Sequence, residues 1–370
     1  MSAQDAAEDT EGPKKLPAGL AAHPSVRAVR AARSAGDRSA PPPVIDADRL
    51  RALCLEAGAD DAAAVSLDHP DLAGEREHVL AALPGTRSLV SLMVRMNRDS
   101  MRSPARSVGN QEFHQTDEQV NAAARKVARA LGDAGYRALN PSAGFPQEME
   151  RFPGRIWVVA HKTVAVAAGL GVMGLHRNVI HPRFGNFVLL ATVLVDAPVS
   201  AYGQELDYSP CVDCKLCVAA CPVGAIGKDG SFDARACTTH NYREFMSGFN
   251  DWVQTVADSE DAADFRSRVT DPENASMWQS LAFKPSYKSG YCLAVCPAGE
   301  DVLGPYLDDR RAYLDTVLRP LQDKTETLYV LPGSQAQRYA ERRFPHKPTK
   351  EVSGGWRPPA RADAETPDGH

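Results

Sequence analysis

The chain has 370 residues, of which 43% are hydrophobic and 24% charged, as expected of a globular protein with a sizeable core. Its net charge of −5 provides no overall basic field for nucleic acid or an anionic membrane. The longest apolar stretch, around Phe187–Val195, is too short to span a bilayer. The N-terminus, MSAQDAAEDTEGPKK, has neither the apolar segment of a signal peptide nor a twin-arginine pair. We therefore expect a cytoplasmic protein with no membrane partner and no nucleic-acid partner.

The first half of the chain predicts an arm followed by a domain of helices and strands. Residues 1–45 are rich in Ala, Pro and charge, which is typical of a disordered or loosely attached segment. An amphipathic helix begins at Asp46, and Cys54 on its apolar face reads as a small buried hydrophobe. Alternating signals then predict an α/β domain over 46–203. Its further elements are the strand Ser88–Val94, the helix Asp117–Leu131, the strand Arg155–Val159, the helix-like segment Lys162–Ala168 and the strand Asn186–Asp196.

The composition changes after Gln204, where cysteines, prolines and short loops become frequent. We predict a metal-binding domain over residues 204–331, with an insertion over 238–288. Residues 332–370 read as a polar tail whose basic residues are solvated rather than bound to nucleic acid.

Seven of the eight cysteines lie in this second region. Four of them form the run Cys211-x2-Cys214-x2-Cys217-x3-Cys221-Pro222, which is the spacing of bacterial ferredoxins. In that arrangement the first three thiolates bind one iron–sulfur cluster and the fourth binds another. A zinc site would need two close pairs of ligands and no proline after the last cysteine. The spacing therefore predicts two iron–sulfur clusters.

The second half of the ligand set is less regular and consists of Cys237 and Cys292-x3-Cys296-Pro297. By pseudo-symmetry, Cys296 completes the first cluster, which is then held by Cys211, Cys214, Cys217 and Cys296. The second cluster keeps Cys221, Cys237 and Cys292 and lacks one thiolate. A regular motif would have cysteine where Ser289 stands. Three explanations remain open: a three-iron cluster, a four-iron cluster with Ser289 or His240 as its fourth ligand, or recruitment of Cys54.

A glycine segment, Gly169-x-Gly171-x2-Gly174, imitates a dinucleotide-binding loop. It follows a helix-like segment instead of a clear strand, and no acidic residue stands at the ribose-binding distance, so a nicotinamide site is not expected.

Together with the cysteines, the motifs Leu83-Pro84-Gly85-Thr86, Ala167–Gly174 and Gly185-Asn186-Phe187 resemble the cobalamin-dependent family that contains epoxyqueuosine reductase and the reductive dehalogenases. The resemblance covers roughly Leu83 to Pro297. It implies an α/β (α+β) nitroreductase-like core that binds cobalamin, and a C-terminal ferredoxin-like double-cluster domain. The residues that it places beside the cofactor are Gly169, Leu170, Gly171, Gly174, His181, Asn186 and Phe187.

One departure from the family concerns the proton donor. Epoxyqueuosine reductases carry an Asp-Ser-Ala segment with a catalytic aspartate, whereas the matching segment here is Asn140-Pro141-Ser142-Ala143. Proline has no proton to donate. The candidate donors are therefore His161, His176 and His114, because histidine exchanges protons near neutral pH.

The favoured hypothesis is a cytoplasmic, cobalamin-dependent iron–sulfur reductase of a small organic substrate, similar to a reductive dehalogenase, with an external donor such as ferredoxin or flavodoxin. A first alternative is an electron-transfer protein that serves a partner enzyme. A second is a tRNA-modifying reductase similar to epoxyqueuosine reductase.

Overall fold

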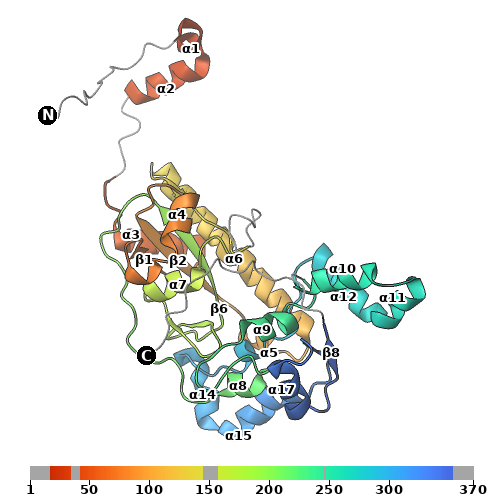
Figure 1. Ribbon diagram of the computed structural model, residues 1–370. Helices are drawn as coiled ribbons and strands as arrows, with labels where there is room; N and C mark the ends of the chain where they lie inside the picture. Colours follow the sequence, from red (N-terminus) through yellow and green to blue (C-terminus); the bar gives the residue numbers. More distant parts are fainter. Residues whose placement is uncertain (1–16, 35–41, 145–156, 246, 353–370) are drawn as a thin grey trace, which may run out of the picture. The chain divides into compact units, whose positions relative to one another are not determined.

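The computed structural model describes residues 17–34, 42–144, 157–245 and 247–352 (Figure 1). Contacts divide the chain into two units, Met1–Pro42 and Pro43–His370. In the first unit, the described residues form helices α1 (Ala18–Ala22) and α2 (Pro24–Ser34), neither of which has a buried residue. This part of the expected arm is therefore helical, although the arm is a separate unit as its composition suggested.

The boundary of the arm also lies earlier than residue 45. Ile45 is 6% exposed and forms a parallel bridge with Val199, so it belongs to the core of the second unit. The second unit is not divided further, and the α/β part and the cysteine-rich part are described together. Among the described residues, no helix is long and apolar enough to cross a membrane.

A four-stranded antiparallel sheet with the order β1-β2-β6-β3 forms the centre of the second unit. Its long strands β2 (Ser88–Arg95) and β6 (Val188–Val195) are mostly buried and pair along their whole length. They correspond to two predicted strands, and their continuous apolar runs reflect burial on both faces. The edge strands are β1 (Asp61–Ser66) and β3 (Ala138–Leu139). Because all pairs are antiparallel, the core is of the α+β type.

Helices cover both faces of this sheet (Figure 1). On one face, α3 (Ala47–Ala57) and α6 (Arg106–Asp133) pack on the strands through one apolar cluster that includes Cys54. On the other face lie η1 (Pro70–Leu72), α4 (Arg76–Ala82) and α7 (His161–Ala167). Cys54 is completely buried, as predicted for a structural residue.

Two predicted elements differ from those observed. Helix α6 begins 11 residues before the predicted Asp117, after the short helix α5 (Arg98–Arg102). The first half of α6 contacts the insertion instead of the sheet. This half therefore lacks the apolar periodicity of a helix that covers a sheet, which is the signal used to predict the second half. The predicted strand Arg155–Val159 lies partly outside the described residues, and Trp157–Val159 do not form a strand.

After α7, the chain forms the two-residue strands β4 (Val172–Met173) and β5 (Val179–Ile180), which pair with each other. The cysteine-rich region that follows β6 is built from short helices and one small sheet. Its elements are α8 (Leu216–Ala220), α9 (Ala234–Asn241), α13 (Tyr291–Ala294), α14 (Glu300–Asp308), α15 (Arg310–Tyr313), η2 (Leu314–Leu318), α16 (Arg319–Asp323), β7 (Leu328–Val330), α17 (Gln335–Arg343) and β8 (Thr349–Glu351).

The expectation of a polar tail from residue 332 is wrong for the described part of that segment. Strand β8 pairs in parallel with β7, and α17 packs on both strands. Ala340 and Phe344 are buried in the same apolar cluster as Cys217 and Cys221. The segment is polar on average because α17 is amphipathic, and its few apolar residues all face this core.

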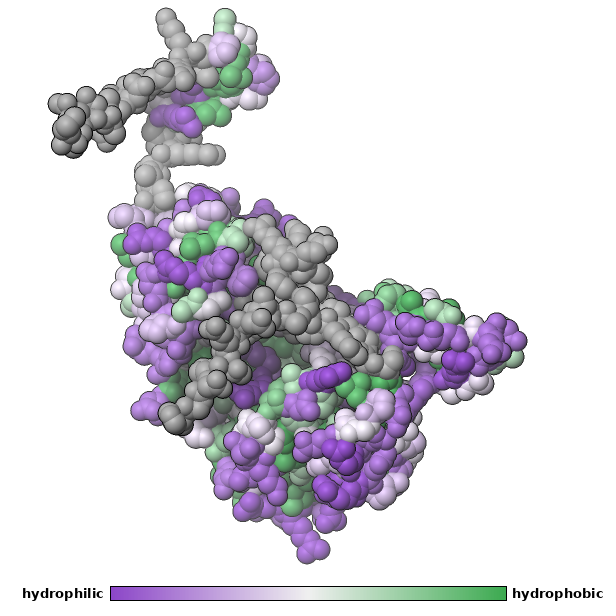
Figure 2. All heavy atoms as spheres, viewed as in Figure 1, coloured by the Kyte–Doolittle hydropathy of each residue, from purple (hydrophilic) through white to green (hydrophobic). Residues whose placement is uncertain are grey.

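The insertion forms the helices α10 (Ser247–Ala257), α11 (Ala262–Arg268) and α12 (Asp271–Ala282), which project from the rest of the second unit (Figure 1). Their surface combines charged residues with apolar ones, visible as green spheres among purple in Figure 2. The large apolar side chains that remain exposed here are Phe249, Val253, Val256, Trp278, Leu281 and Phe283.

Candidate cluster-binding site

The structure brings together the four cysteines that were assigned to the first cluster. Cys217 lies on α8, Cys211 and Cys214 lie in the preceding loop, and Cys296 follows α13. Asp213 and Lys215 adopt left-handed backbone conformations, with φ of 51° each, which turn the loop back on itself. Burial, together with the nearby thiolates of the other three cysteines, raises the pKa of Cys296 to about 12. The four sulfurs therefore face a common centre.

The second set also converges. Cys221, Cys237 and Cys292 belong to one apolar cluster. Burial raises the pKa of Cys292 to about 12, and the thiols of Cys237 and Cys221 add to this shift. The backbone N–H of Ala225 donates a hydrogen bond to the Cys221 sulfur at 3.2 Å. Such N–H donors stabilise the thiolates of iron–sulfur clusters.

The two sets adjoin each other, because the thiol of Cys292 also raises the pKa of Cys217. Electrons could thus pass between clusters held by the two sets. The thiol-rich, mostly buried surroundings suit iron–sulfur clusters better than an oxygen-preferring metal.

The candidates for the missing fourth ligand are placed very differently. Cys54 lies in the core between α3, α6 and the sheet, so the recruitment of this residue is excluded by the fold. Ser289 is held beside α9, because its N–H donates to the Asn241 side chain at 2.8 Å and the N–H of Lys288 donates to the Asn241 carbonyl at 3.0 Å. Its segment is therefore attached to the helix that also carries Cys237.

His240 is the other candidate for the fourth ligand, and one of its two ring nitrogens already accepts a hydrogen bond. Its Nδ1 accepts a hydrogen bond from the Tyr329 N–H at 3.3 Å. Its Nε2 is buried and has no hydrogen-bond partner among the described residues. Both candidates are connected with the helix that carries Cys237, because His240 lies on α9 itself and Ser289 is hydrogen-bonded to Asn241 at its end.

Two polar side chains border the second set. The ammonium of Lys162, on α7, donates hydrogen bonds to the Arg177 carbonyl at 2.6 Å and to the Asn178 side chain at 2.9 Å. Surrounding protein lowers its pKa, although part of the side chain is exposed, and the thiolates of Cys292 and Cys237 oppose this shift. Burial raises the pKa of Tyr242 to about 12, and the same two thiolates raise it as well. The second set therefore faces the α7 side of the molecule.

His161 lies at the start of α7, against the sheet. Its Nδ1 is 2.8 Å from the hydroxyl of Thr192 on β6, and Glu75 accepts a hydrogen bond from the N–H of the preceding Ala160. Its Nε2 is buried and makes no hydrogen bond with the described residues, although the backbone of Ser142 lies near the ring. Burial lowers the pKa of His161 to about 4. The imidazole is thus neutral at pH 7.

His176 is buried as well and links two segments. Its Nδ1 accepts from the Asn178 N–H at 3.1 Å, and its Nε2 lies 3.2 Å from the Asn186 side chain. Burial lowers its pKa to about 4. Asn186 also donates to the carbonyl of Leu293, next to Cys292, at 3.3 Å. As with His161, the expectation of an imidazolium proton donor near neutral pH does not fit this environment.

His114 lies in the first half of α6. Its Nε2 is 2.7 Å from the carbonyl of Pro285, and its ring lies 6.1 Å from that of Tyr287. These contacts hold the end of the insertion against α6. In this structure His114 therefore has a positioning role.

The glycines contact the chain's own backbone, which differs from the expected cofactor cradle. At Gly169, where φ is 75°, a Cβ atom would lie 2.1 Å from the carbonyl oxygen of Gln204. At Gly171 it would lie 2.6 Å from the Ile180 carbonyl oxygen, and at Gly174 2.7 Å from the Ile180 side chain. The space above these glycines is already filled, so they are required for close packing.

The other predicted cofactor contacts are mostly engaged in packing. Leu170 and Phe187 are core residues with 4% and 1% exposure. His181 stacks on Phe184, and its Nε2 lies 3.2 Å from an Asp61 carboxylate oxygen. Asn186 alone in this group keeps a buried side-chain oxygen with no partner among the described residues. It remains the best of these positions for contact with a bound group.

Two buried hydroxyls of the sheet, on Thr192 beside His161 and on Ser91, were not predicted from the sequence. Thr192 on β6 is directly opposite Ser91 on β2, and both are 0% exposed. The Ser91 hydroxyl has no partner among the described residues. A polar residue within an otherwise apolar strand, as in VLLATVLV, was the signal that could have identified Thr192.

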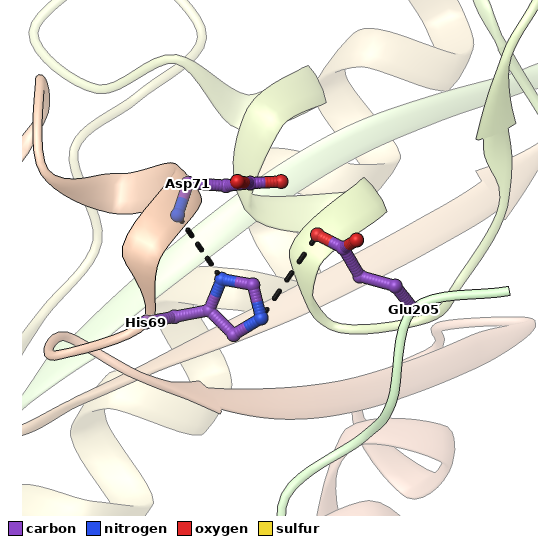
Figure 3. A group of neighbouring side chains, drawn as sticks. All are labelled: His69, Asp71 and Glu205. Atoms are coloured by element: carbon purple, nitrogen blue, oxygen red, sulfur yellow. Dashed lines mark hydrogen bonds and ion pairs between the residues drawn. The ribbon is translucent and has the colours of Figure 1, made fainter.

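A surface group of three ionisable side chains ties the linker after β6 to η1 (Figure 3). His69 lies between the other two: its Nδ1 accepts from the Asp71 N–H, and its Nε2 is 3.9 Å from a Glu205 carboxylate oxygen. Asp71 and Glu205 are exposed. The group anchors the start of the cysteine-rich region.

Comparison with known proteins supports iron–sulfur binding by the run from Cys211 to Cys221. Residues 205–227 match the family described as 4Fe-4S binding domain. An epoxyqueuosine reductase from Synechococcus sp. (strain CC9605) is 28% identical over 161 residues, which cover 42% of this chain and 45% of that protein. The match thus spans less than half of that relative.

Two solved structures show weaker similarity. A catabolic reductive dehalogenase has a TM-score of 0.44 and 16% identity, over 73% of this chain and 34% of the other. An epoxyqueuosine reductase with an epoxyqueuosine-modified tRNA stem loop has a TM-score of 0.40 and 16% identity, over 84% of this chain and 76% of the other. Together with the cysteine motif, the sequence matches show that this chain is similar to 4Fe-4S binding domains and to proteins named epoxyqueuosine reductase.

Proposed function

We propose that this chain is an iron–sulfur oxidoreductase of the epoxyqueuosine reductase type, which reduces a modified base in RNA. The observation that carries the proposal is the pair of adjoining cysteine sets, the second of which faces Lys162 and the segment after α7. Proteins named epoxyqueuosine reductase are similar in sequence to this chain. The expectation that no nucleic acid is involved is therefore replaced, because one solved protein of that name holds a tRNA stem loop.

Removal of an epoxide oxygen as water consumes two electrons and two protons. Clusters supply electrons singly at low potential, so two adjoining sets suit the electron part of this reaction. An external donor such as ferredoxin or flavodoxin would reduce the clusters. The first set has four cysteines and the second has three plus Ser289, which gives the two clusters unequal surroundings.

Cobalamin is the organic cofactor that the family resemblance implies, and when bound it would carry the two-electron step. Only some of the described residues at this place could contact a bound cobalamin. The Cβ directions of Gly169 and Gly171 are occupied by the chain's own backbone, whereas Asn186 and His161 offer buried polar atoms that have no hydrogen-bond partner among the described residues. Direct binding of cobalamin must therefore be measured separately from activity.

Proton delivery must differ from that in the resembling family. Pro141 stands at the place of the aspartate, and the Ser142 backbone lies near His161. As a neutral imidazole, His161 can orient a water molecule or a substrate hydroxyl through a ring nitrogen, and Thr192 fixes the other nitrogen.

A small organic substrate remains the second candidate, because the departure at Pro141 removes the residue specific to epoxyqueuosine reduction. The test is to purify the full chain anaerobically, count iron and sulfide, and record electron paramagnetic resonance (EPR) spectra. Reduction is then assayed on an epoxyqueuosine-containing stem loop and on an aryl halide, with and without cobalamin.

Cys214→Ser should lose the signal of the first cluster, whereas Cys54→Ala, outside both sets, should keep it. Queuosine formation supports the proposal. Dehalogenation alone supports the second candidate, and a wild-type protein that binds no iron refutes both.

A further inference from the structure

Helix α2 carries a one-sided cluster of arginines. Arg27, Arg30 and Arg33 recur every three residues, and residues 17–34 contain no acidic residue. At 100° per residue the three side chains lie within ~120° of one face, and they span ~9 Å of the helix axis. None of them forms an ion pair with another described residue, and no residue of α2 is buried. Residues 17–34 therefore carry a net charge of +3, in contrast to the negative charge of the chain as a whole.

The opposite face of α2 argues against an apolar partner. It consists of alanines with Pro24, Ser25 and Val29, whereas Val26 lies on the arginine side, and the helix contains no Trp, Phe or Leu. Helices that lie in membranes bury such large side chains, and helices that dock in protein grooves use them as anchors. The binding potential of α2 is thus electrostatic. Arginine binds phosphate oxygens bidentately, so an array of three guanidiniums suits a phosphate backbone.

We propose that α2 binds the phosphate backbone of an RNA, through Arg27, Arg30 and Arg33. The inference rests on the proposed function for the choice of RNA among polyanions. It assigns RNA contact to a segment outside the region that resembles the reductase family, which begins near Leu83.

The test measures binding of the full chain to an unmodified tRNA by fluorescence anisotropy at 50–200 mM salt. The variant R27A/R30A/R33A removes the array and keeps the helix, because alanine is the best helix former. The variant R125A/R129A/R266A removes the same charge from exposed positions of α6 and α11 and serves as the matched control. Circular dichroism checks that all three proteins are folded.

Each lost phosphate contact should reduce the slope of log K against log salt by ~0.7–0.9, so the array variant should show a slope smaller by about 2–3. Its deficit in affinity should then shrink by about 20- to 40-fold between 50 and 200 mM salt. Equal slopes for the two variants would overturn the proposal. So would loss of binding to anionic lipid vesicles, but not to tRNA, in the array variant.

The salt dependence of RNA binding can be measured independently of the reductase activity. The RNA used lacks the modified base, and binding requires no electrons. If the EPR spectrum shows no cluster while the array still governs RNA binding, the proposed reductase function fails and this inference stands. If clusters and reduction are present but the two variants have equal salt slopes, the proposed reductase function stands and the inference about α2 fails.

Discussion

The substitution Gly169→Ala tests whether the glycine turn serves the chain itself or a bound cofactor. The added Cβ would lie 2.1 Å from the carbonyl oxygen of Gln204, which is backbone and cannot rotate away. With φ at 75°, alanine also pays ~1–2 kcal/mol for the left-handed conformation. Overpacking adds ~1–3 kcal/mol. We therefore expect a loss of about 2–5 kcal/mol in the free energy of unfolding.

The assay is equilibrium unfolding of the anaerobically purified protein, followed by circular dichroism. For a chain of this length, a loss of this size should lower Tm by roughly 3–7 °C. Gly132→Ala is the matched control, because its Cβ would meet nothing within 4 Å and it lies inside α6. That variant should be unchanged or more stable by up to ~1 kcal/mol. If Gly169→Ala is as stable as the wild type but no longer binds cofactor, our reading of the turn is wrong.

Three further predictions concern the clusters, the buried histidine and the C-terminal segment. Ser289→Cys should supply a fourth thiolate to the second set, so EPR should show two four-iron clusters, and an unchanged spectrum would count against Ser289. His161 has a folded pKa of about 4 and an unfolded pKa near ~6.5, so its contribution to stability is complete above pH 6.5 and is lost as the pH falls toward 4. His161→Gln should flatten this pH dependence by on the order of 3 kcal/mol, and an identical profile would contradict the burial argument. Phe344→Ala should cost ~3–5 kcal/mol in urea unfolding, whereas a free tail would tolerate it.

The strands and the cysteine sets could be predicted because their signals are local. Uninterrupted apolar runs identified β2 and β6. The spacing of Cys211, Cys214 and Cys217 follows from the geometry of one tight loop, and the return of Cys296 follows from pseudo-symmetry. Each of these inferences needed only neighbouring residues or a repeated motif.

The remaining features depend on contacts between distant segments. The role of Gly169 is set by Gln204, 35 positions later, and nothing near the glycine reveals that contact. His161 looked like a proton donor because free histidine titrates near neutral pH, but burial against the sheet lowers its pKa. Residues 335–352 have the composition of a polar tail, because the few apolar side chains that pack into the core are spaced along the otherwise polar helix α17.

The same C-terminal segment has a consequence for biosynthesis. The core around Cys217 and Cys221 is completed by Ala340 and Phe344, about 130 residues after Cys211. At translation rates of ~5–20 residues per second, the first ligands leave the ribosome on the order of ten seconds before the helix that covers them. During this interval the cysteine loop has no core to shield it from oxygen or from competing metals. Iron–sulfur assembly factors therefore have a time window in which the ligands are accessible, and it closes when α17 docks.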